Sequence, residues 1–547
     1  MDDNVKSIVA SHSSRLIERY PAAYRDFFSM PSGAPCIYKS GPAWPEFERK
    51  GTHAQSFIRE ARPIYDHPIA GSWLKIGTDI YKFLDSCSVM WTSIDPVAFA
   101  NAGEKKPFCT LLIWIGVKQE TLLFDAAVAA ADVIKRILTV AGFPEIEVAF
   151  RESEVTHSVA QAGPKLFSFN PLDDPIPAFR KPFTPTIGLS IAPLKAPHLE
   201  GTGSLYFRLS KDDDRIVLLT AAHVARPPPI CPDIGTGYRH THTSQRLEKI
   251  VALGEMGYRN ATNAMITATS TLKESINRWN KAIAKQGEFV EGEPVGRTER
   301  RRANEREVEN ATMLINNLKT FHDEVTKYRA NPVQRTIGFV LHSEPIVIPD
   351  GPNKFTCDWA FIQLYPEMID WNTFPGNKVY LGGDLSPSDF GELMFPQPND
   401  RADYDYPEDE LLPVFGVVKD DEIRRPNHLD VHGEKALLVV KNGRTTGTTI
   451  GRTNGLESFT RPYIENGPKY TSIDVAVLPY DKLRGPFSAA GDSGSIILDR
   501  AGRIVALLTG GAGTAKGTDI TYGTPYWWLE EQIKKVFPDC HLYTPAT

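Results

Sequence analysis

Two short motifs, TAAH at residues 220–223 and GDSG at residues 491–494, decide how the rest of this sequence is interpreted. The first closes the stretch IVLLTAAHV (216–224), in which an apolar, strand-like run leads into a turn that ends in His223. The second opens GDSGSIILDRAGRIVALLTGG (491–511), in which a glycine-rich turn precedes two apolar runs. At about 5% usage per residue type, a given tetrapeptide occurs by chance in about one in 300 chains of this length. Finding both in this order is therefore improbable by accident.

The residue types in these turns are those that nucleophilic catalysis requires. A serine hydroxyl is a poor nucleophile while it keeps its proton, and a histidine can remove that proton near neutral pH. An acidic residue is then needed to fix the tautomer of the imidazole ring. Two aspartates between the motifs stand before similar apolar runs, Asp358 in CDWAFIQL and Asp474 in IDVAVLP. Taken singly, a serine in GDSG could also be a turn residue and His223 a hydrogen-bonded histidine at a strand end.

The two motifs resemble those of the trypsin/chymotrypsin-like serine peptidases, which present histidine in TAAH and the nucleophile in GDSG, in the chain order His, Asp, Ser. The resemblance implies a triad of His223, Asp358 and Ser493. Asp474 is the rival, but it lies nineteen residues before Ser493, where the family has the strand that leads into the nucleophile loop. The resemblance further implies that the N–H groups of Gly491 and Ser493 form the oxyanion hole. The multidomain plan is similar to that of non-secreted fungal members.

The resemblance also gives expectations for substrate choice. The position six residues before the nucleophile, which lies in the family's primary specificity pocket, is Phe487. Tryptic members have an aspartate there that binds Arg or Lys, so Phe487 favours an apolar side chain instead. Thr509, Gly510 and Gly511 are expected to form the pocket wall, where small residues leave room.

The sequence departs from digestive members of the family at two points. No IVGG-like start is visible, so nothing indicates activation by a new N-terminus, and the partner of Asp492 is left open. Cysteines do not flank Ser493 or pair near His223, so the usual disulfides of the family are not expected.

From residue 186 onward the sequence alternates short apolar runs with turns, a pattern typical of a sandwich or barrel. With the resemblance, this predicts a mainly β, chymotrypsin-like double β-barrel over residues 186–547. Residues 245–328 interrupt the pattern with two helical stretches joined by a Gly/Pro-containing loop, which predicts an inserted antiparallel helical hairpin, similar to a coiled coil. Arginines and glutamates are mixed in the second stretch near 297–307, which is more typical of a solvated surface than of a nucleic-acid site.

The first 170 residues predict a separate α/β accessory domain. A strand at 108–117, a helix at 123–140 and a strand at 145–150 follow one another, and no GxGxxG or P-loop motif is present. A docking role and a purely structural role remain open for this domain. Prolines are dense in residues 171–185, which predicts a linker without helix or central strand.

Composition excludes several classes of function. Hydrophobic residues make up 41% of the 547 residues and the net charge is −6, so the chain is neither disordered nor drawn as a whole to nucleic acid or an anionic membrane. No apolar run reaches the roughly 18 residues of a membrane span, and the acidic N-terminus is unlike a signal peptide, so we expect a cytoplasmic or nuclear protein. The six scattered cysteines form no CxxC pair, which predicts reduced thiols and no metal site or cofactor.

The sequence therefore predicts a serine endopeptidase that cleaves protein or peptide substrates through an acyl-enzyme. Two alternatives remain. A catalytically silent, protease-like scaffold could bind a protein partner through the helical hairpin, or the same triad could hydrolyse esters. The oligomeric state is left open.

Overall fold

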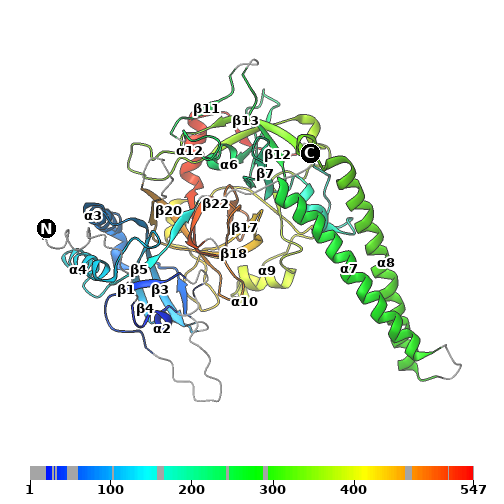
Figure 1. The fold of residues 1–547 in the computed structure, drawn as a ribbon, viewed down its shortest axis with the longest axis horizontal. Helices are drawn as coiled ribbons and strands as arrows, with labels where there is room; N and C mark the ends of the chain where they lie inside the picture. Colours follow the sequence, from blue (N-terminus) through cyan, green and yellow to red (C-terminus); the bar gives the residue numbers. More distant parts are fainter. Residues whose placement is uncertain are drawn as a thin grey trace.

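The computed structural model describes residues 20–27, 30, 34–45, 59–101, 104–156, 166–233, 235–241, 245–287, 293–461, 471–514 and 517–545. Figure 1 shows an N-terminal α/β layer, a central β region and a long helical hairpin that projects from it. The β region is the part that positions the candidate site.

The second half of the β region is a closed barrel of six strands. The strand order is β20-β18-β17-β21-β22-β23, and β20 also pairs with β23, which closes the ring. Apolar side chains that alternate along these strands fill its interior, among them Val439, Val477 and Val505. The strands are β17 (Leu438–Gly443), β18 (Gly447–Thr453), β20 (Ser472–Pro479), β21 (Ile496–Asp499), β22 (Ile504–Thr514) and β23 (Gly517–Pro525).

The first half of the β region is a curled sheet that forms a half-barrel, in the order β24-β9-β10-β14-β13-β12-β7-β8, with β11 (Tyr238–Arg239) paired to β13. A closed barrel beside a curled sheet is consistent with the expected double-barrel fold. After helix α12 (Tyr526–Val536), the C-terminal tail returns to this sheet as β24 (His541–Leu542). The other strands are β7 (Leu189–Pro193), β8 (Gly201–Gly203), β9 (Tyr206–Arg208), β10 (Ile216–Thr220), β12 (Lys249–Ala252), β13 (Thr336–Ser343) and β14 (Ala360–Leu364).

The N-terminal layer contains the expected strand, helix and strand as β4 (Cys109–Val117), α4 (Phe124–Val140) and β5 (Glu147–Glu152). β4 and β5 are parallel, as a helical crossover requires. The sheet also includes β1 (Cys36–Lys39), β2 (Arg59–Arg62) and β3 (Trp91–Asn101), and the helix α3 (Trp73–Ser86) packs on it.

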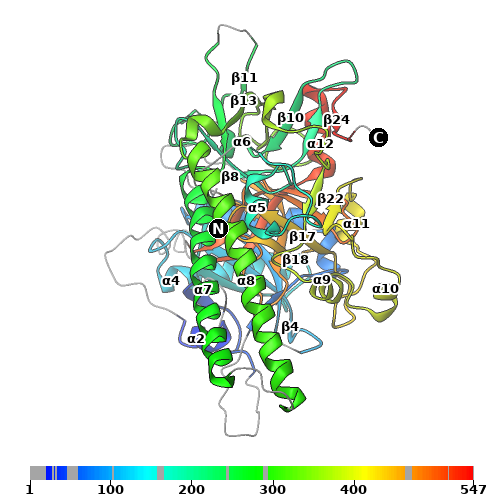
Figure 2. The ribbon, with the colours of Figure 1, turned by 90° about the vertical axis from the view of Figure 1, so that its right-hand side faces the viewer.

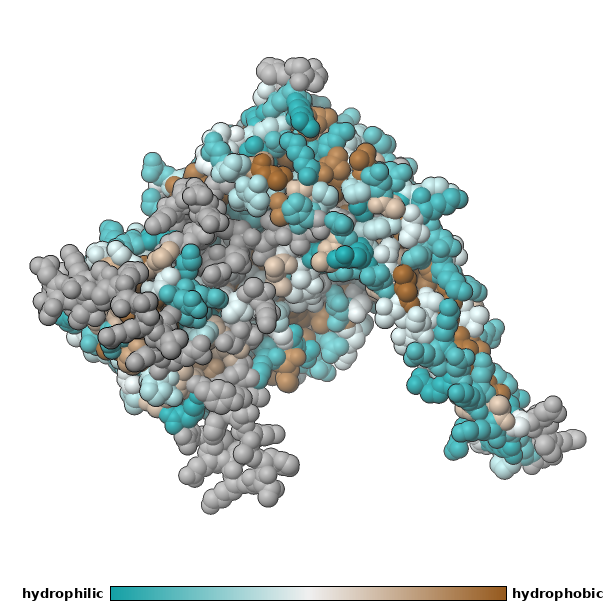
Figure 3. Space-filling view, in the orientation of Figure 1, coloured by the Kyte–Doolittle hydropathy of each residue, from teal (hydrophilic) through white to brown (hydrophobic). Residues whose placement is uncertain are grey.

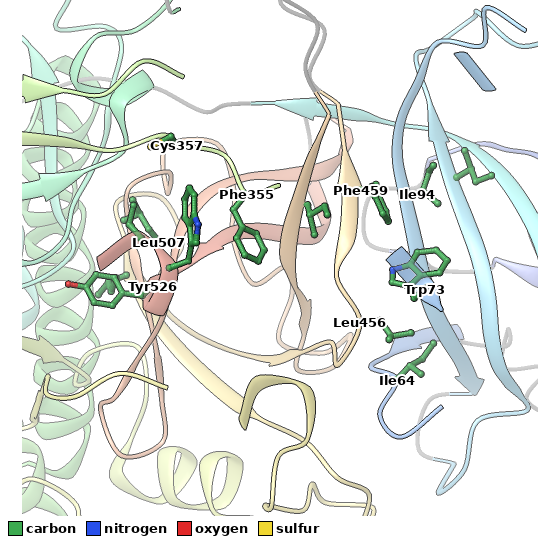
Figure 4. Close-up of a cluster of buried hydrophobic side chains, with 14 of the residues drawn as sticks. Ile64, Trp73, Ile94, Phe355, Cys357, Leu456, Phe459, Leu507 and Tyr526 are labelled. Carbon is green, nitrogen blue, oxygen red and sulfur yellow. The ribbon is translucent and has the colours of Figure 1, made fainter. Parts of the chain in front are cut away.

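The strands of this layer and those of the closed barrel belong to one continuous hydrogen-bonded sheet. β3 pairs with β19 (Ser458–Thr460), and β19 pairs with β20 of the barrel. Figure 4 shows the result in side chains, because Trp73 and Ile94 lie against Phe459 while Phe355 and Leu507 continue the same apolar cluster along the barrel. Separating the two parts would expose this shared core.

The Pro-rich segment 171–185 was expected to be a linker without helix or central strand, and the expected absence of helix is wrong. It contains the one-turn helix α5 (Pro177–Arg180) and the 3₁₀ turn η2 (Lys181–Phe183). Proline is tolerated in the first turn of a helix, where its missing N–H would have no partner. Phe183 is 0% exposed and its ring lies 5.4 Å from that of Phe321, so the segment is packed against the helical hairpin.

The hairpin consists of α7 (Glu255–Gln286) and α8 (Val295–Arg329). The helical region was expected from residue 245, but Lys249–Ala252 is strand β12, because its residues pair with β13 and β7 on its two sides. α7 ends at Gly287, whose φ of 71° favours glycine. Figure 2 shows both helices extending well beyond the barrels, and Figure 3 shows a mostly hydrophilic surface there with scattered hydrophobic residues.

Candidate active site

Two neighbouring strands of the curled sheet bring His223 and Asp358 together. β10 and β14 are antiparallel with Thr220 opposite Ala360, so the residue three beyond Thr220 and the residue two before Ala360 meet at one end of the sheet. His223 Nδ1 lies 2.6 Å from Asp358 Oδ2, and the His223 backbone N–H donates to Asp358 Oδ1 at 3.1 Å. Both side chains are almost fully buried. The carboxylate therefore holds the histidine by its ring and by its main chain.

Ser493 lies in a tight turn immediately before β21. Gly491 and Gly494 have φ values of 100° and 88°, in the left-handed region that favours glycine. A Cβ on Gly494 would also lie 2.2 Å from the carbonyl oxygen of Thr202, so no larger residue fits. Ser493 is 1% exposed, and its Oγ lies 3.4 Å from the carbonyl oxygen of Thr509 on β22.

Thr202 on β8 joins this turn to the sheet that carries the histidine. Its N–H donates to the Ser493 carbonyl and its Oγ1 donates to the Gly491 carbonyl, both at 2.9 Å. Its own carbonyl accepts from Thr220 Oγ1 at 2.8 Å, three residues before His223. One strand thus contacts both the serine turn and the histidine turn. Sequence reasoning missed Thr202, which lies in the stretch GTGSLYF (201–207).

Asp492, whose partner the sequence left open, is held by a buried cation and by hydrogen bonds. Lys441 Nζ lies 3.6 Å from Asp492 Oδ2, and both side chains are fully buried. Asp492 also accepts from Thr446 Oγ1 at 2.6 Å and from the backbone N–H groups of Thr445 and Ala489 at 2.7 and 2.9 Å. Burial lowers the pKa of Lys441, and Asp492 opposes that shift by favouring the ammonium. These contacts fix the main chain on the N-terminal side of Ser493.

Asp474 lies in a different environment from Asp358. It is in β20, where its Oδ2 accepts from Thr460 Oγ1 at 2.6 Å and from Ser472 Oγ at 2.7 Å. Burial raises its pKa from 3.8 to about 6, and the two hydroxyl hydrogen bonds oppose the shift. The two hydrogen bonds that hold His223 come from Asp358.

The expected pocket residues lie in two places. Thr509, Gly510 and Gly511 are on β22 beside the Ser493 turn, because the Gly494 N–H donates to the Leu508 carbonyl at 2.8 Å. Phe487 is 1% exposed and belongs to the apolar cluster inside the closed barrel. Its predicted effect on substrate choice stays a prediction.

A buried ion pair connects the base of the hairpin to the same region, and no sequence motif indicated it. Glu200 is fully buried and pairs with Arg444, whose N–H donates to Thr202 Oγ1 at 3.2 Å. The N–H of Gly257 in the first turn of α7 approaches the other Glu200 oxygen at 3.5 Å. Burial raises the pKa of Glu200, while Arg444 opposes that shift.

The described part of the chain holds no group of three or more His, Cys, Asp and Glu side chains arranged for a metal ion. All six cysteines are free thiols. None of the described helices combines the length and the apolar character that a membrane span needs.

Comparison with known proteins gives little similarity. The chain matches no protein-family model, and no curated protein matches it. Among solved structures it is similar to a glutamic-acid-specific serine protease that uses a histidine triad in substrate binding, at 10% sequence identity and a TM-score of 0.28, over 65% of this chain and 100% of that chain.

Proposed function

We propose that this protein is a serine endopeptidase that hydrolyses peptide bonds through an acyl-enzyme, with Ser493 as nucleophile, His223 as general base and Asp358 as the residue that orients the histidine. The proposal rests above all on the 2.6 Å contact between His223 Nδ1 and Asp358 Oδ2 in a buried site. Because an ionised carboxylate can only accept, the proton lies on Nδ1, and Nε2 is the basic nitrogen.

The reaction follows from these roles. His223 Nε2 takes the proton of Ser493 as the hydroxyl oxygen attacks the substrate carbonyl, and the imidazolium that forms is stabilised by Asp358. The C–N bond breaks as the imidazolium returns the proton to the leaving amine. Water then attacks the acyl-serine ester with His223 again as base, which releases the acid and restores the hydroxyl.

The turn geometry supports the proposed oxyanion hole. In a trans peptide the C=O and N–H groups point in opposite directions. The Ala490 carbonyl accepts from Thr445 Oγ1, so the Gly491 N–H points away from Thr445. The Asp492 carbonyl accepts from the Ser495 N–H at 3.0 Å, so the Ser493 N–H points away from Ser495. Both N–H groups therefore point away from the hydrogen bonds that hold the turn. On that side they can donate to the oxyanion that develops in the transition state.

Fluorophosphonate labelling of the purified full chain tests this proposal. We expect labelling of the native protein and of Ser270→Ala, a control serine on the exposed surface of α7, and none of Ser493→Ala. A panel of peptide substrates and matched esters then separates a peptidase from an esterase. Labelling that persists in Ser493→Ala, or a folded native protein that is never labelled, would contradict the proposal and favour the scaffold alternative.

A further inference from the structure

Beyond the end of β21, the edge of β22 next to the nucleophile is occupied by another segment of the chain. On one side β22 pairs with β23 along most of its length. On its other side β21 pairs only with Ile504 to Leu507, and the Ser493 turn follows, since the Leu508 N–H donates to the Ser495 carbonyl at 2.9 Å. The next residues on that side, Gly511 to Gly513, pair with β6 (Glu154–Thr156), which follows the N-terminal layer's strand β5.

β6 runs toward the nucleophile. The pairing is antiparallel, with Glu154 opposite Gly513, Val155 opposite Ala512 and Thr156 opposite Gly511. As the chain advances along β6, it therefore moves along β22 in the direction of Thr509, whose carbonyl contacts Ser493 Oγ. An extended polypeptide that reaches Ser493 along this edge would form the same backbone hydrogen bonds, because sheet edges bind extended peptides by adding them as a strand.

The residues that precede β6 are held in place by a hydrogen bond and a buried ion pair. Only Ser153 separates β6 from β5, and its N–H donates to the Val117 carbonyl at 2.8 Å. At the end of β5, the buried Arg151 pairs with Asp519 of β23 at 2.6 Å, and its guanidinium lies 3.6 Å from the ring centroid of Trp114. A strand that is held at such a base competes with free substrate at a high effective concentration. Its pairing is three residues long, so a longer peptide can displace it.

We propose that β6 acts as a competitor in cis, occupying the edge of β22 on which an extended peptide substrate would bind. This inference rests on the proposed peptidase function and adds a regulator to it. The N-terminal layer then sets the fraction of molecules in which the edge of β22 is open to long substrates. Short substrates, which do not need the edge beyond Gly510, are unaffected.

Proline substitutions in β6 test the proposal in the full chain. A proline removes a ladder N–H that alanine keeps, and alternate residues donate across an antiparallel pair. Val155→Pro and Glu154→Pro are therefore compared with Val155→Ala and Glu154→Ala. For at least one position we expect kcat/KM on a hexapeptide to be about tenfold higher with proline than with alanine. Fluorophosphonate labelling and hydrolysis of a single-residue ester are expected to be equal within each pair.

Equal hexapeptide kinetics in both pairs, with labelling intact, would overturn the competitor role and leave the peptidase proposal standing. Absence of labelling in every protein would overturn both.

A measurement on the unsubstituted chain guards against variants that fail to fold. An extended peptidyl phosphonate on Ser493 should speed amide hydrogen exchange in Glu154–Thr156, whereas a small fluorophosphonate should not. Unchanged exchange with the extended probe would also overturn the proposal.

Discussion

Asp358 and Asp474 stand in nearly the same local sequence and lie in very different surroundings. Each precedes an alanine and an apolar run, in CDWAFIQL and in IDVAVLP. Asp358 ends a loop before β14, and the neighbouring strand β10 delivers His223 to it. Asp474 lies within β20 opposite Ser458, and hydroxyl groups are its partners. The role of a carboxylate is therefore decided by the strand next to it rather than by its own segment.

Asp358→Asn should have the largest effect of the changes that separate the two carboxylates. An asparagine amide would donate where the carboxylate accepts, so His223 would be held in the wrong tautomer. We expect kcat for peptide hydrolysis to fall by about 10⁴-fold, with slower fluorophosphonate labelling. Steady-state kinetics measure it, and Asp474→Asn is the matched control. A larger loss of kcat in Asp474→Asn would exchange the two assignments.

A third buried carboxylate sharpens the comparison, because Asp492 is partnered by a cation. Lys441→Met would leave Asp492 buried without its ammonium, a change that costs about 3–5 kcal/mol in comparable pairs. We expect the free energy of unfolding to fall by about that amount, and kcat to fall as the Ser493 turn loosens. Denaturant unfolding measures the first quantity. Lys435→Met is the control, since Lys435 pairs with Asp66 at the surface and should cost less than about 1 kcal/mol.

The pH dependence of stability should report the titration of Asp474. Its pKa is raised in the folded state to about 6 from 3.8. The folded protein thus binds more protons than the unfolded chain between pH 4 and pH 6, and stability falls as pH rises through that window. Asp474→Asn removes this loss, so its unfolding free energy should gain on the native protein by about 2 kcal/mol from pH 4 to pH 7. If the unfolding free energies of the native protein and of Asp474→Asn changed with pH in parallel, the raised pKa of Asp474 would be contradicted.

The smallest effect is expected from Thr460→Val. The Thr460 hydroxyl donates to Asp474 and favours its charged form. Its loss should raise the pKa of Asp474 further, which moves the upper end of the same pH window upward, and should lower the unfolding free energy by about 1 kcal/mol. The pH series used for Asp474→Asn measures both. A downward shift of the window would show that the hydroxyl does not stabilise the carboxylate.

The sequence predicted much of the site's local structure, because the motifs carry their own geometry. Glycines that flank Ser493 imply a tight turn with positive φ, and an apolar run before TAAH implies a strand that ends at His223. The pairing of β10 with β14, which brings Asp358 to the histidine, depends on residues 140 positions apart, Thr220 and Ala360. Such long-range pairing leaves no signal in either segment.

The partners of Asp492 and the position of β6 could not be predicted for the same reason. Lys441 begins the stretch KNGRTTGTTIG (441–451), and nothing in that stretch indicates that its ammonium is buried beside Asp492. Phe487 lies in the barrel core, and its predicted role in the specificity pocket stays a prediction. Prolines in segment 171–185 indicated an irregular chain, whereas burial of Phe183 is set by packing against α8.

The return of β24 to the curled sheet ties assembly of the site to the order of translation. Residues 541 and 542 pair with β9, and the Asn377 amide donates to the carbonyls of both Tyr206 and Tyr543. A ribosome adds residues at about 5–20 per second and makes this tail after every other described strand. A nascent chain can therefore contain the histidine, the aspartate and the serine while β9 is still an open edge. Completion of the sheet that holds two of them waits for residues synthesised after the nucleophile.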